Sequence, residues 1–381
     1  MIHATDLRPF LSEVAEVERT PRGQRPHRLP APIRRRFPDP QLLAMEAQPS
    51  GVRLTFRTTA TRVALTVIAS RLGFAGIDRP RGRIDLTVDD VFAGSSVLTG
   101  GDLTETDLRT GSTTVRPGDA HRAAFEDLPA RDKTVELWLP HNESVELVRL
   151  QADAELRPVH DDRPLWLHHG SSISHGSNAV GPTAIWPAVA SRAAGHRLRN
   201  LGFGGSALLD PFVARTMRDL PADVISLKVG INIVNLDVMR RRAFTAALHG
   251  FLDTIRDGHP STPLLVVTPI FCGIHEDTPG PGAIDPASLQ TGAARFIATG
   301  APGDTALGRL TLRVVREAIG EVLEHRDDPA LHLVDGLRLY GREDAERIPL
   351  PDGLHPDTDG HALIGGRFAP RLREHGRTRA N

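Results

Sequence analysis

A change of hydrophobic pattern near residue 156 constrains the fold most strongly. Before it, short runs alternate apolar and polar residues between Gly- and Pro-rich turns: Val52–Phe56, Val63–Ile68, Ile84–Val88 and Val135–Leu139. Alternation with a period of two predicts strands that bury one face, and many such short strands are typical of a β-sandwich or jelly roll. No helix of any length is expected between Pro49 and Glu155. The sequence therefore predicts an all-β domain over residues 1–155.

After that point, predicted strands and helices alternate. The expected strands are 165–167, 197–201, 224–229, 264–268 and 331–334. The expected helices are 184–194, 207–220, 238–257, 307–325 and one that follows Pro356. Regular β–α alternation predicts a parallel sheet covered by helices, with functional sites at the carboxyl ends of its strands. Residues 156–381 are thus expected to form a second, α/β domain.

Charge and cysteine content narrow the possible partners. The chain has 46 basic and 47 acidic residues among 381, a formal net charge of −1, so no basic excess favours nucleic acid or an anionic membrane. The single cysteine, Cys272, cannot form a disulfide within the chain. No segment approaches the ~20 apolar residues of a membrane span. We expect a cytoplasmic protein that acts on small molecules, and predict no oligomeric state.

Two segments do not fit the strand and helix patterns. Pro21–Pro40, which includes the basic run Arg34–Arg36, is expected to be an extended arm or linker with a solvated surface. Cys272–Ala306 is rich in Gly, Pro, Thr and Ala and is too long for a simple connector. Long loops of this kind often line active sites, so this segment is expected to be a lid or pocket wall.

Four polar blocks follow predicted strands or precede the last helix. They are Gly170–Gly176, Asn200–Ser206, Gly230–Asn232 and Asp352–Pro356. Together they offer serine hydroxyls, glycines that let the backbone approach a ligand, an amide, and a carboxylate three residues before an imidazole. These are the parts of a nucleophilic site: a nucleophile, oxyanion donors, and a base with the group that orients it.

Each block also has a purely structural interpretation. Asp352 could cap the last helix, Asn232 could satisfy a turn, and Gly205 could serve a tight turn. The three histidines His168, His169 and His175 could ligate zinc, although the carboxylates or thiolates of a typical zinc site are missing nearby. We expect them to border the pocket instead, and Ser174 to form a hydrogen bond within its turn.

The four blocks, in this order and spacing, resemble the GDSL or SGNH family of esterases, lipases and acyltransferases over residues 160–370. The resemblance implies a flavodoxin-like three-layer α/β/α domain. It identifies Ser172 as the nucleophile, Asp352 and His355 as its triad partners, and the Ser172 N–H, Gly205 and Asn232 as the oxyanion hole. Ser171 stands where the family usually has Asp. The family uses no metal, and we expect no cofactor.

The resemblance implies an acyl-enzyme on Ser172, formed from an ester or thioester donor. If water takes the acyl group from Ser172, the protein is an esterase, and if a bound alcohol takes it, the protein is an acyltransferase. The sequence leaves both reactions open. The domain order is similar to that of actinobacterial GDSL acyltransferases that decorate polyketides. The sequence also leaves two other functions open: a carbohydrate esterase whose N-terminal sandwich helps to bind sugar, and a non-catalytic binding protein. Trp138 is the only tryptophan that the sandwich could offer to a sugar.

Overall fold

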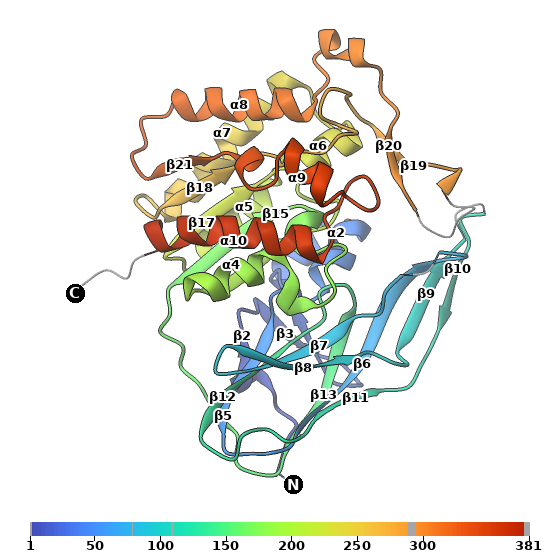
Figure 1. Ribbon diagram of the computed structural model, residues 1–381, viewed down its shortest axis with the longest axis vertical. Helices are drawn as coiled ribbons and strands as arrows, with labels where there is room; N and C mark the ends of the chain where they lie inside the picture. Colours follow the sequence, from blue (N-terminus) through green and yellow to red (C-terminus); the bar gives the residue numbers. More distant parts are fainter. Residues whose placement is uncertain (1, 78, 108–109, 289–293, 377–381) are drawn as a thin grey trace. The chain divides into compact units, whose positions relative to one another are not determined.

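A computed structural model describes residues 2–77, 79–107, 110–288 and 294–376. The chain divides into two compact units (Figure 1). The N-terminal unit comprises Met1–Asp162 with Gly181–Thr183, and the C-terminal unit comprises Arg163–Val180 with Ala184–Asn381. The first is rich in β-strands and the second has a parallel sheet with helices, so the predicted fold class is confirmed.

Two sheets build the N-terminal unit. The larger has the order β10-β9-β6-β13-β4-β3, with β1 and β11 paired to β13 and β6. Its strands are β1 (Ile2–Ala4), β3 (Glu16–Arg19), β4 (Gln24–His27), β6 (Val63–Phe74), β9 (Asp102–Thr106), β10 (Thr113–Arg116), β11 (His121–Phe125) and β13 (Ser144–Ala152). The smaller has the order β14-β5-β12-β7-β8, with β2 paired to β5. Its strands are β2 (Leu11–Ser12), β5 (Arg53–Thr58), β7 (Arg83–Val88), β8 (Val91–Val97), β12 (Lys133–Trp138) and β14 (Arg157–Pro158).

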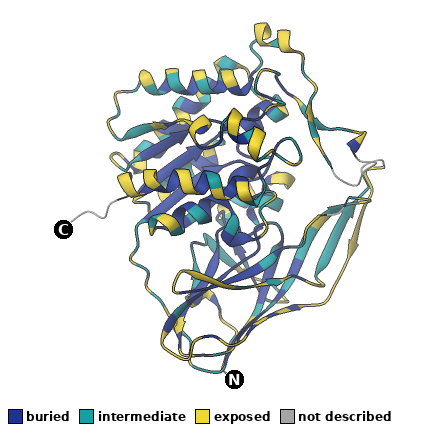
Figure 2. Ribbon diagram, in the orientation of Figure 1, coloured by how far each residue is buried: buried dark blue, intermediate teal, exposed yellow. Residues whose placement is uncertain are grey.

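The core of this unit draws on both sheets. The smaller sheet contributes Leu54, Leu86 and Leu137, and the larger contributes Leu65 and Leu147, all with no exposed surface. Figure 2 shows the buried residues running along the strands of both sheets. Because side chains alternate along a strand, the alternating runs in the sequence predict one buried face per sheet. In the smaller sheet, β5, β7 and β12 bury nearly every residue, so these strands are covered on both faces.

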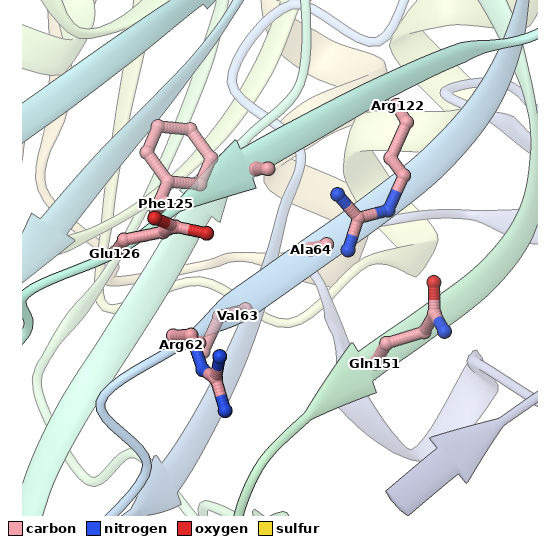
Figure 3. A pocket seen from close by; sticks show the side chains of 8 residues that line it. Arg62, Val63, Ala64, Arg122, Phe125, Glu126 and Gln151 are labelled. Atoms are coloured by element: carbon pink, nitrogen blue, oxygen red, sulfur yellow. The ribbon is translucent and has the colours of Figure 1, made fainter. Parts of the chain in front are cut away.

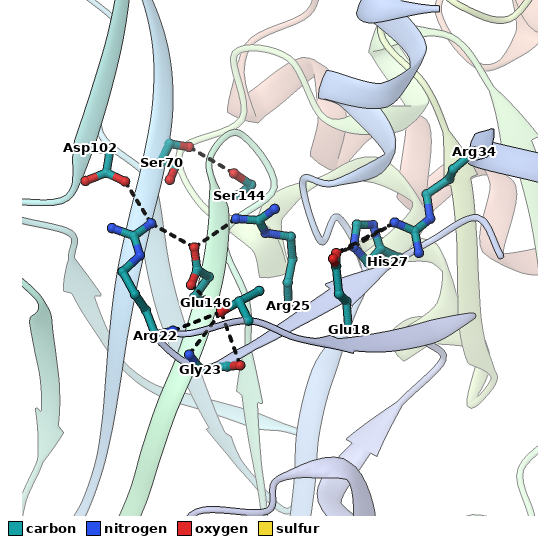
Figure 4. A network of polar contacts seen from close by, with 11 residues as sticks. Glu18, Arg22, Gly23, Arg25, His27, Arg34, Ser70, Asp102, Ser144 and Glu146 are labelled. Atoms are coloured by element: carbon teal, nitrogen blue, oxygen red, sulfur yellow. Dashed lines mark hydrogen bonds and ion pairs between the residues drawn. The ribbon is translucent and has the colours of Figure 1, made fainter. Parts of the chain in front are cut away.

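The expectation of an extended arm at Pro21–Pro40 is wrong. The segment contains β4, helix α1 (Ala31–Arg36) and the start of helix α2 (Pro40–Glu46). Ion pairs hold it to the larger sheet: the Glu146 carboxylate on β13 accepts hydrogen bonds from Arg22 at 2.7 Å and Arg25 at 2.8 Å (Figure 4). Two arginines of this segment therefore pair with a carboxylate that is distant in sequence, and Arg34 of the basic run pairs with Glu16 at 3.3 Å.

The larger sheet also carries a hollow, on β6, β11 and β13 (Figure 3). Ala64 on β6 is the cross-strand partner of Ala124 on one side and Gln151 on the other. The two alanines leave space that Arg62, Arg122 and Glu126 frame (Figure 3). Sugar binding by this unit stays a prediction.

Five parallel strands form the sheet of the C-terminal unit, in the order β16-β15-β17-β18-β21. They are β15 (Leu165–Gly170), β16 (Arg197–Gly202), β17 (Val224–Lys228), β18 (Leu264–Val267) and β21 (Leu331–Val334). All five were expected; four agree with these bounds within one residue, and β15 runs three residues beyond the expected 165–167. Strands β17 and β18 are buried along their whole length, as a sheet covered on both faces requires.

Helices cover both faces of this sheet. On one face, Trp166 of β15 stacks on Phe368 and contacts Trp186, from helices α10 (Thr358–His375) and α4 (Trp186–Ala194). On the other face, His169 stacks on Phe251 of helix α7 (Arg241–Gly258), which packs with α5 (Pro211–Asp219) and α8 (Leu312–Glu324). Residues 166 and 169 point to opposite faces because side chains alternate along a strand.

Several elements of this unit were not predicted: helices α3 (Ser172–His175), α6 (Ile231–Leu236) and α9 (Arg342–Arg347), and a hairpin of β19 (Gly282–Ile284) and β20 (Phe296–Ala298). The helix expected over 307–325 begins only at Leu312, because the Thr311 side chain caps it by accepting the Val314 N–H. No helix in the described part of the chain is long and apolar enough to cross a membrane.

Candidate active site

Ser172 begins helix α3, directly after strand β15, which lies between β16 and β17 in the sheet. The preceding Ser171 is the N-cap, and its hydroxyl accepts the Ile173 N–H at 3.4 Å. Ser171 thereby performs at this position a capping role that an Asp could also fill. The helix ends at Gly176, whose φ of 112° favours glycine. Ser172 is thus presented by a single helical turn at the carboxyl edge of the sheet.

Glycines on two adjacent strands let α3 lie close to the strand ends. A Cβ on Gly202, the last residue of β16, would come within 2.6 Å of the His175 nitrogen and the Ser174 carbonyl carbon. A Cβ on Gly170 would collide with the Ser174 hydroxyl. Asn200 on β16 also holds α3 in place, because its side-chain amide donates a hydrogen bond to the Ser174 carbonyl oxygen at 2.9 Å. Gly170, Asn200 and Gly202 therefore fix the position of helix α3, the serine turn, against the ends of β15 and β16.

Ser172, His355 and Asp352 lie in one hydrogen-bonded row. The His355 Nε2 is 2.9 Å from the Ser172 Oγ, and the His355 Nδ1 is 2.7 Å from the Asp352 Oδ2. The exposed fractions of Ser172 and His355 are 8% and 9%, so solvent reaches both only in part. With Nδ1–H donating to the carboxylate, the Nε2 lone pair is directed at the serine hydroxyl.

The Asp352 carboxylate is held as an anion. Burial raises its pKa, but hydrogen bonds from His355 and from the backbone N–H of Leu354 outweigh burial and bring the pKa below its ordinary value. The Oδ1 accepts the N–H of Leu354 at 2.9 Å and of His355 at 2.7 Å. The Asn178 amide, which the sequence gave no reason to select, donates to Oδ2 at 3.1 Å.

Gly205 and Asn232 follow the two strands that flank β15 in the sheet. Gly205 follows β16 with a φ of 70°, and Asn232 lies in the first turn of α6, after β17. The Asn232 Oδ1 accepts the Ala207 N–H at 3.2 Å, which joins the two loops and fixes the amide orientation. The Nδ2–H₂ donors of Asn232 are then available to the site. The structure thus brings both residues to the sheet edge that carries Ser172.

The other histidines near Ser172 bond to neighbouring protein groups. His168 lies between Ser226 at 2.7 Å and Ser174 at 2.8 Å, and His169 contacts the Leu201 carbonyl at 2.6 Å. The Ser174 hydroxyl therefore bonds to the strand, whereas its backbone N–H donates within the turn, to the Ser171 carbonyl at 3.0 Å, as expected. Within the described residues, no group of three or more His, Cys, Asp or Glu side chains could hold a metal ion.

His361 on α10 also supports the site, and the sequence analysis missed it. Its Nδ1 accepts the Trp186 N–H at 3.2 Å, so its Nε2–H donates to the Ser177 carbonyl at 2.9 Å. Complete burial lowers its pKa to about 4, which keeps the ring neutral. This imidazole ties the helix that follows His355 to the turn that follows Ser172.

Lys228, at the end of β17, is an unusual buried cation. Burial lowers its pKa to about 8. It lines a small cavity with Ile173 and Cys272, next to the serine turn. Cys272 is also buried, and its thiol donates to the Gly353 carbonyl at 3.4 Å.

Comparisons with known proteins agree with this architecture. Residues 165–272 match the family described as GDSL-like Lipase/Acylhydrolase. No curated protein matches the chain. Among solved structures, the salicylyl-acyltransferase SsfX3 from a tetracycline biosynthetic pathway is 27% identical, with a TM-score of 0.80 over 100% of this chain and 99% of that one.

Two further structures are similar in fold alone. A Bacteroides ovatus protein described as a GDSL-like lipase is 19% identical, with a TM-score of 0.70 over 98% of this chain and 97% of that one. A family two carbohydrate esterase from Cellvibrio japonicus is 13% identical, with a TM-score of 0.56 over 98% and 97%. The family match covers the serine turn and the strands on either side of it, so this part of the chain is similar to GDSL-like lipases and acylhydrolases.

Proposed function

We propose that this protein is an acyltransferase in which Ser172, His355 and Asp352 form a catalytic triad. The observation that carries the proposal is the row of two hydrogen bonds, 2.9 Å from Ser172 to His355 and 2.7 Å from His355 to Asp352. A serine hydroxyl is a weak nucleophile at neutral pH, and an imidazole within hydrogen-bond reach, itself oriented by a carboxylate, is what activates it.

In the first half-reaction, the Ser172 Oγ attacks the carbonyl carbon of an ester or thioester while His355 Nε2 takes the hydroxyl proton. The carbonyl oxygen becomes an oxyanion, which the N–H groups of Ser172 and Gly205 and the amide of Asn232 stabilise. His355 then gives the proton to the leaving alcohol or thiol. The product is an acyl ester on Ser172, and the Asp352 carboxylate stabilises the imidazolium throughout.

Two observations support transfer to an alcohol over hydrolysis. The likeness to SsfX3, which is described as a salicylyl-acyltransferase, extends over the full length of both chains at 27% identity. The nucleophile and the base are also more than nine-tenths buried, which limits the access of water to the acyl-enzyme. The likeness to carbohydrate esterases, at 13% identity, concerns the fold alone.

The proposed reaction uses the groups of the α/β domain, residues 156–381. In this proposal the β-sandwich, residues 1–155, is accessory, and the partners are a small acyl donor and an alcohol, with no cofactor and no metal. A cytoplasmic location stays a prediction.

The test is product analysis with and without an acceptor. The protein is incubated with a panel of acyl thioesters, alone and with a panel of alcohols, and the products are identified by mass spectrometry. The proposal predicts an acyl-protein that persists without an acceptor and yields an ester when an alcohol is added. Steady release of free acid at the same rate with and without alcohol would identify an esterase instead.

A further inference from the structure

The hairpin of β19 and β20 brings an aromatic ring to the triad. The ring of Phe296, the first residue of β20, is centred 5.6 Å from the His355 imidazole, with an angle of 79° between the ring planes. Its backbone N–H donates to the Asp352 carbonyl oxygen at 2.7 Å. Phe296 therefore contacts both residues of the triad that lie outside the serine turn.

The chain that carries the hairpin is tied to helix α6 as well. The His275 Nε2 lies 3.2 Å from the Asn235 Oδ1 on α6, the helix that also holds Asn232. Gly280 packs so closely on the Val234 carbonyl of α6 that a Cβ would collide with it. Thr299, directly after β20, donates its N–H to the Pro281 carbonyl at 2.8 Å. The position of Phe296 is thus set from α6 on one side and from the triad loop on the other.

We propose that Phe296 is the apolar wall of the acceptor subsite, and that it selects an alcohol carried on an apolar, ring-bearing body over water. This inference rests on the proposed function, because it concerns the second half-reaction of the same site. It names the residue that favours transfer to an alcohol over hydrolysis, and it names the chemical class of the acceptor.

The second half-reaction explains why this position matters. The acceptor oxygen attacks the acyl carbon, and its proton passes to His355 Nε2. The bond from the acyl carbon to Ser172 Oγ then breaks, and His355 returns the proton to Oγ. The attacking molecule must therefore stand beside the imidazole, within reach of Phe296. A phenyl ring offers water no hydrogen bond, whereas it offers an apolar body surface to bury and a ring to stack on.

The chain supplies a matched control one residue away. Ile297 is also apolar and on the same strand, but side chains alternate along a strand, so it points away from the face that carries Phe296. Its exposed fraction is 38%, so its truncation to Ala should disturb the fold little.

The experiment measures how the acyl-enzyme divides between water and alcohol. The wild type and the variants Phe296→Ala, Phe296→Gln, Phe296→Leu and Ile297→Ala react with p-nitrophenyl butyrate in the presence of equal concentrations of benzyl alcohol or glycerol. The p-nitrophenol burst reports the acylation of Ser172, and mass spectrometry gives the ratio of butyrate ester to free butyric acid.

In the wild type, the ester-to-acid ratio should be higher with benzyl alcohol than with glycerol. Phe296→Ala and Phe296→Gln should lower the benzyl ratio by at least about tenfold, the scale of selectivity that one apolar contact provides, with little change in the burst rate. Phe296→Leu, which keeps an apolar side chain, should recover much of the ratio. Ile297→Ala should match the wild type.

An unchanged ratio in Phe296→Ala would overturn the inference, and so would an equal fall in Ile297→Ala or equal wild-type ratios for the two alcohols. If acylation and deacylation slow together at a constant ratio, Phe296 only positions His355, which also overturns it. Phe296→Gln, close in size to the native residue, decides the question if Phe296→Ala fails to fold. A wild type with no burst and no product would contradict the proposed function, and this inference with it.

Discussion

The imidazole of His355 lies 2.9 Å from the hydroxyl of Ser172, although 183 residues separate them in the chain. Ser172 follows strand β15 of a parallel sheet, and His355 lies in a loop just before the last helix. The Asp352 carboxylate accepts both the backbone N–H and the Nδ1–H of His355. One short loop therefore sets the orientation of the base before any substrate binds.

Replacing Asp352 by Asn tests the orientation of the base. The amide can donate to Nδ1, which would leave the proton on Nε2 and direct an N–H at Ser172. We expect kcat to fall by about 10³–10⁴-fold with a native melting temperature. Asn178→Ala, which removes only one donor to Asp352, should cost less than about tenfold. Activity of Asp352→Asn within tenfold of the wild type would show that the carboxylate does not control the tautomer.

Replacing Asn232 by Ala tests the oxyanion hole. Loss of one donor typically costs about 10²–10³-fold in kcat. Asn232→Asp is the informative partner, because it keeps an oxygen for the Ala207 N–H but replaces the donating amide with an anion. We expect both variants to lose activity in steady-state assays, and Asn232→Asp to lose at least as much. If Asn232→Asp retained activity, the residue would serve the loop structure alone.

Replacing Gly202 by Ala tests whether the close packing of α3 on the end of β16 positions Ser172. The added Cβ would meet the backbone of α3 at 2.6 Å, so α3 must shift and carry Ser172 away from His355. We expect lower kcat and a melting temperature lower by several degrees, for a loss of roughly 1–3 kcal/mol from overpacking. The control is Gly366→Ala on α10, where the added Cβ meets nothing within 4 Å and the helix should gain stability.

The two lysines of the chain should respond oppositely to substitution by Met. The Lys133 ammonium donates to the Ala60 carbonyl at 2.6 Å, so Lys133→Met leaves a buried acceptor unpaired and should destabilise by roughly 1–3 kcal/mol. For Lys228, no hydrogen bond among the described residues contributes to its pKa, which burial lowers from 10.5 to about 8. Lys228→Met should therefore stabilise the protein at pH 7 by about 3 kcal/mol.

The pH dependence gives the sign of the Lys228 effect. Because the folded pKa lies below the unfolded value, the unfolded chain binds more protons between about pH 8 and 10.5, and the stability of the wild type rises with pH over that range. The advantage of Lys228→Met should shrink over the same window. Urea unfolding at pH 7 and pH 10 measures it. A Lys228→Met variant less stable than the wild type at pH 7 would mean that the ammonium has a favourable partner.

Sequence reasoning located the parts of the site that stand at strand ends. Gly205, Asn232 and Ser172 each follow a strand that the β–α alternation predicts, and a parallel sheet brings the carboxyl ends of such strands to one edge. Asp352 and His355 are three residues apart, so their contact is local. The roles of these residues stay proposals until they are tested.

The parts that escaped prediction depend on contacts distant in sequence. Phe296 meets His355, and Asn178 meets Asp352, through pairings that leave no periodic signal in either segment. The expectation that Cys272–Ala306 forms a pocket wall was the only hint of Phe296. The arm expected at Pro21–Pro40 was wrong for the same reason: Glu146, which binds its arginines, lies more than a hundred residues away.

The measurement that tests the central claim most directly is the site of acylation. The wild type and Ser172→Ala are mixed with p-nitrophenyl butyrate, quenched in acid and analysed by intact-protein and peptide mass spectrometry. The proposed mechanism predicts one butyryl group on the wild type, on the peptide that contains Ser172, and neither label nor turnover in Ser172→Ala. Butyryl on another residue, or undiminished turnover by Ser172→Ala, would contradict it.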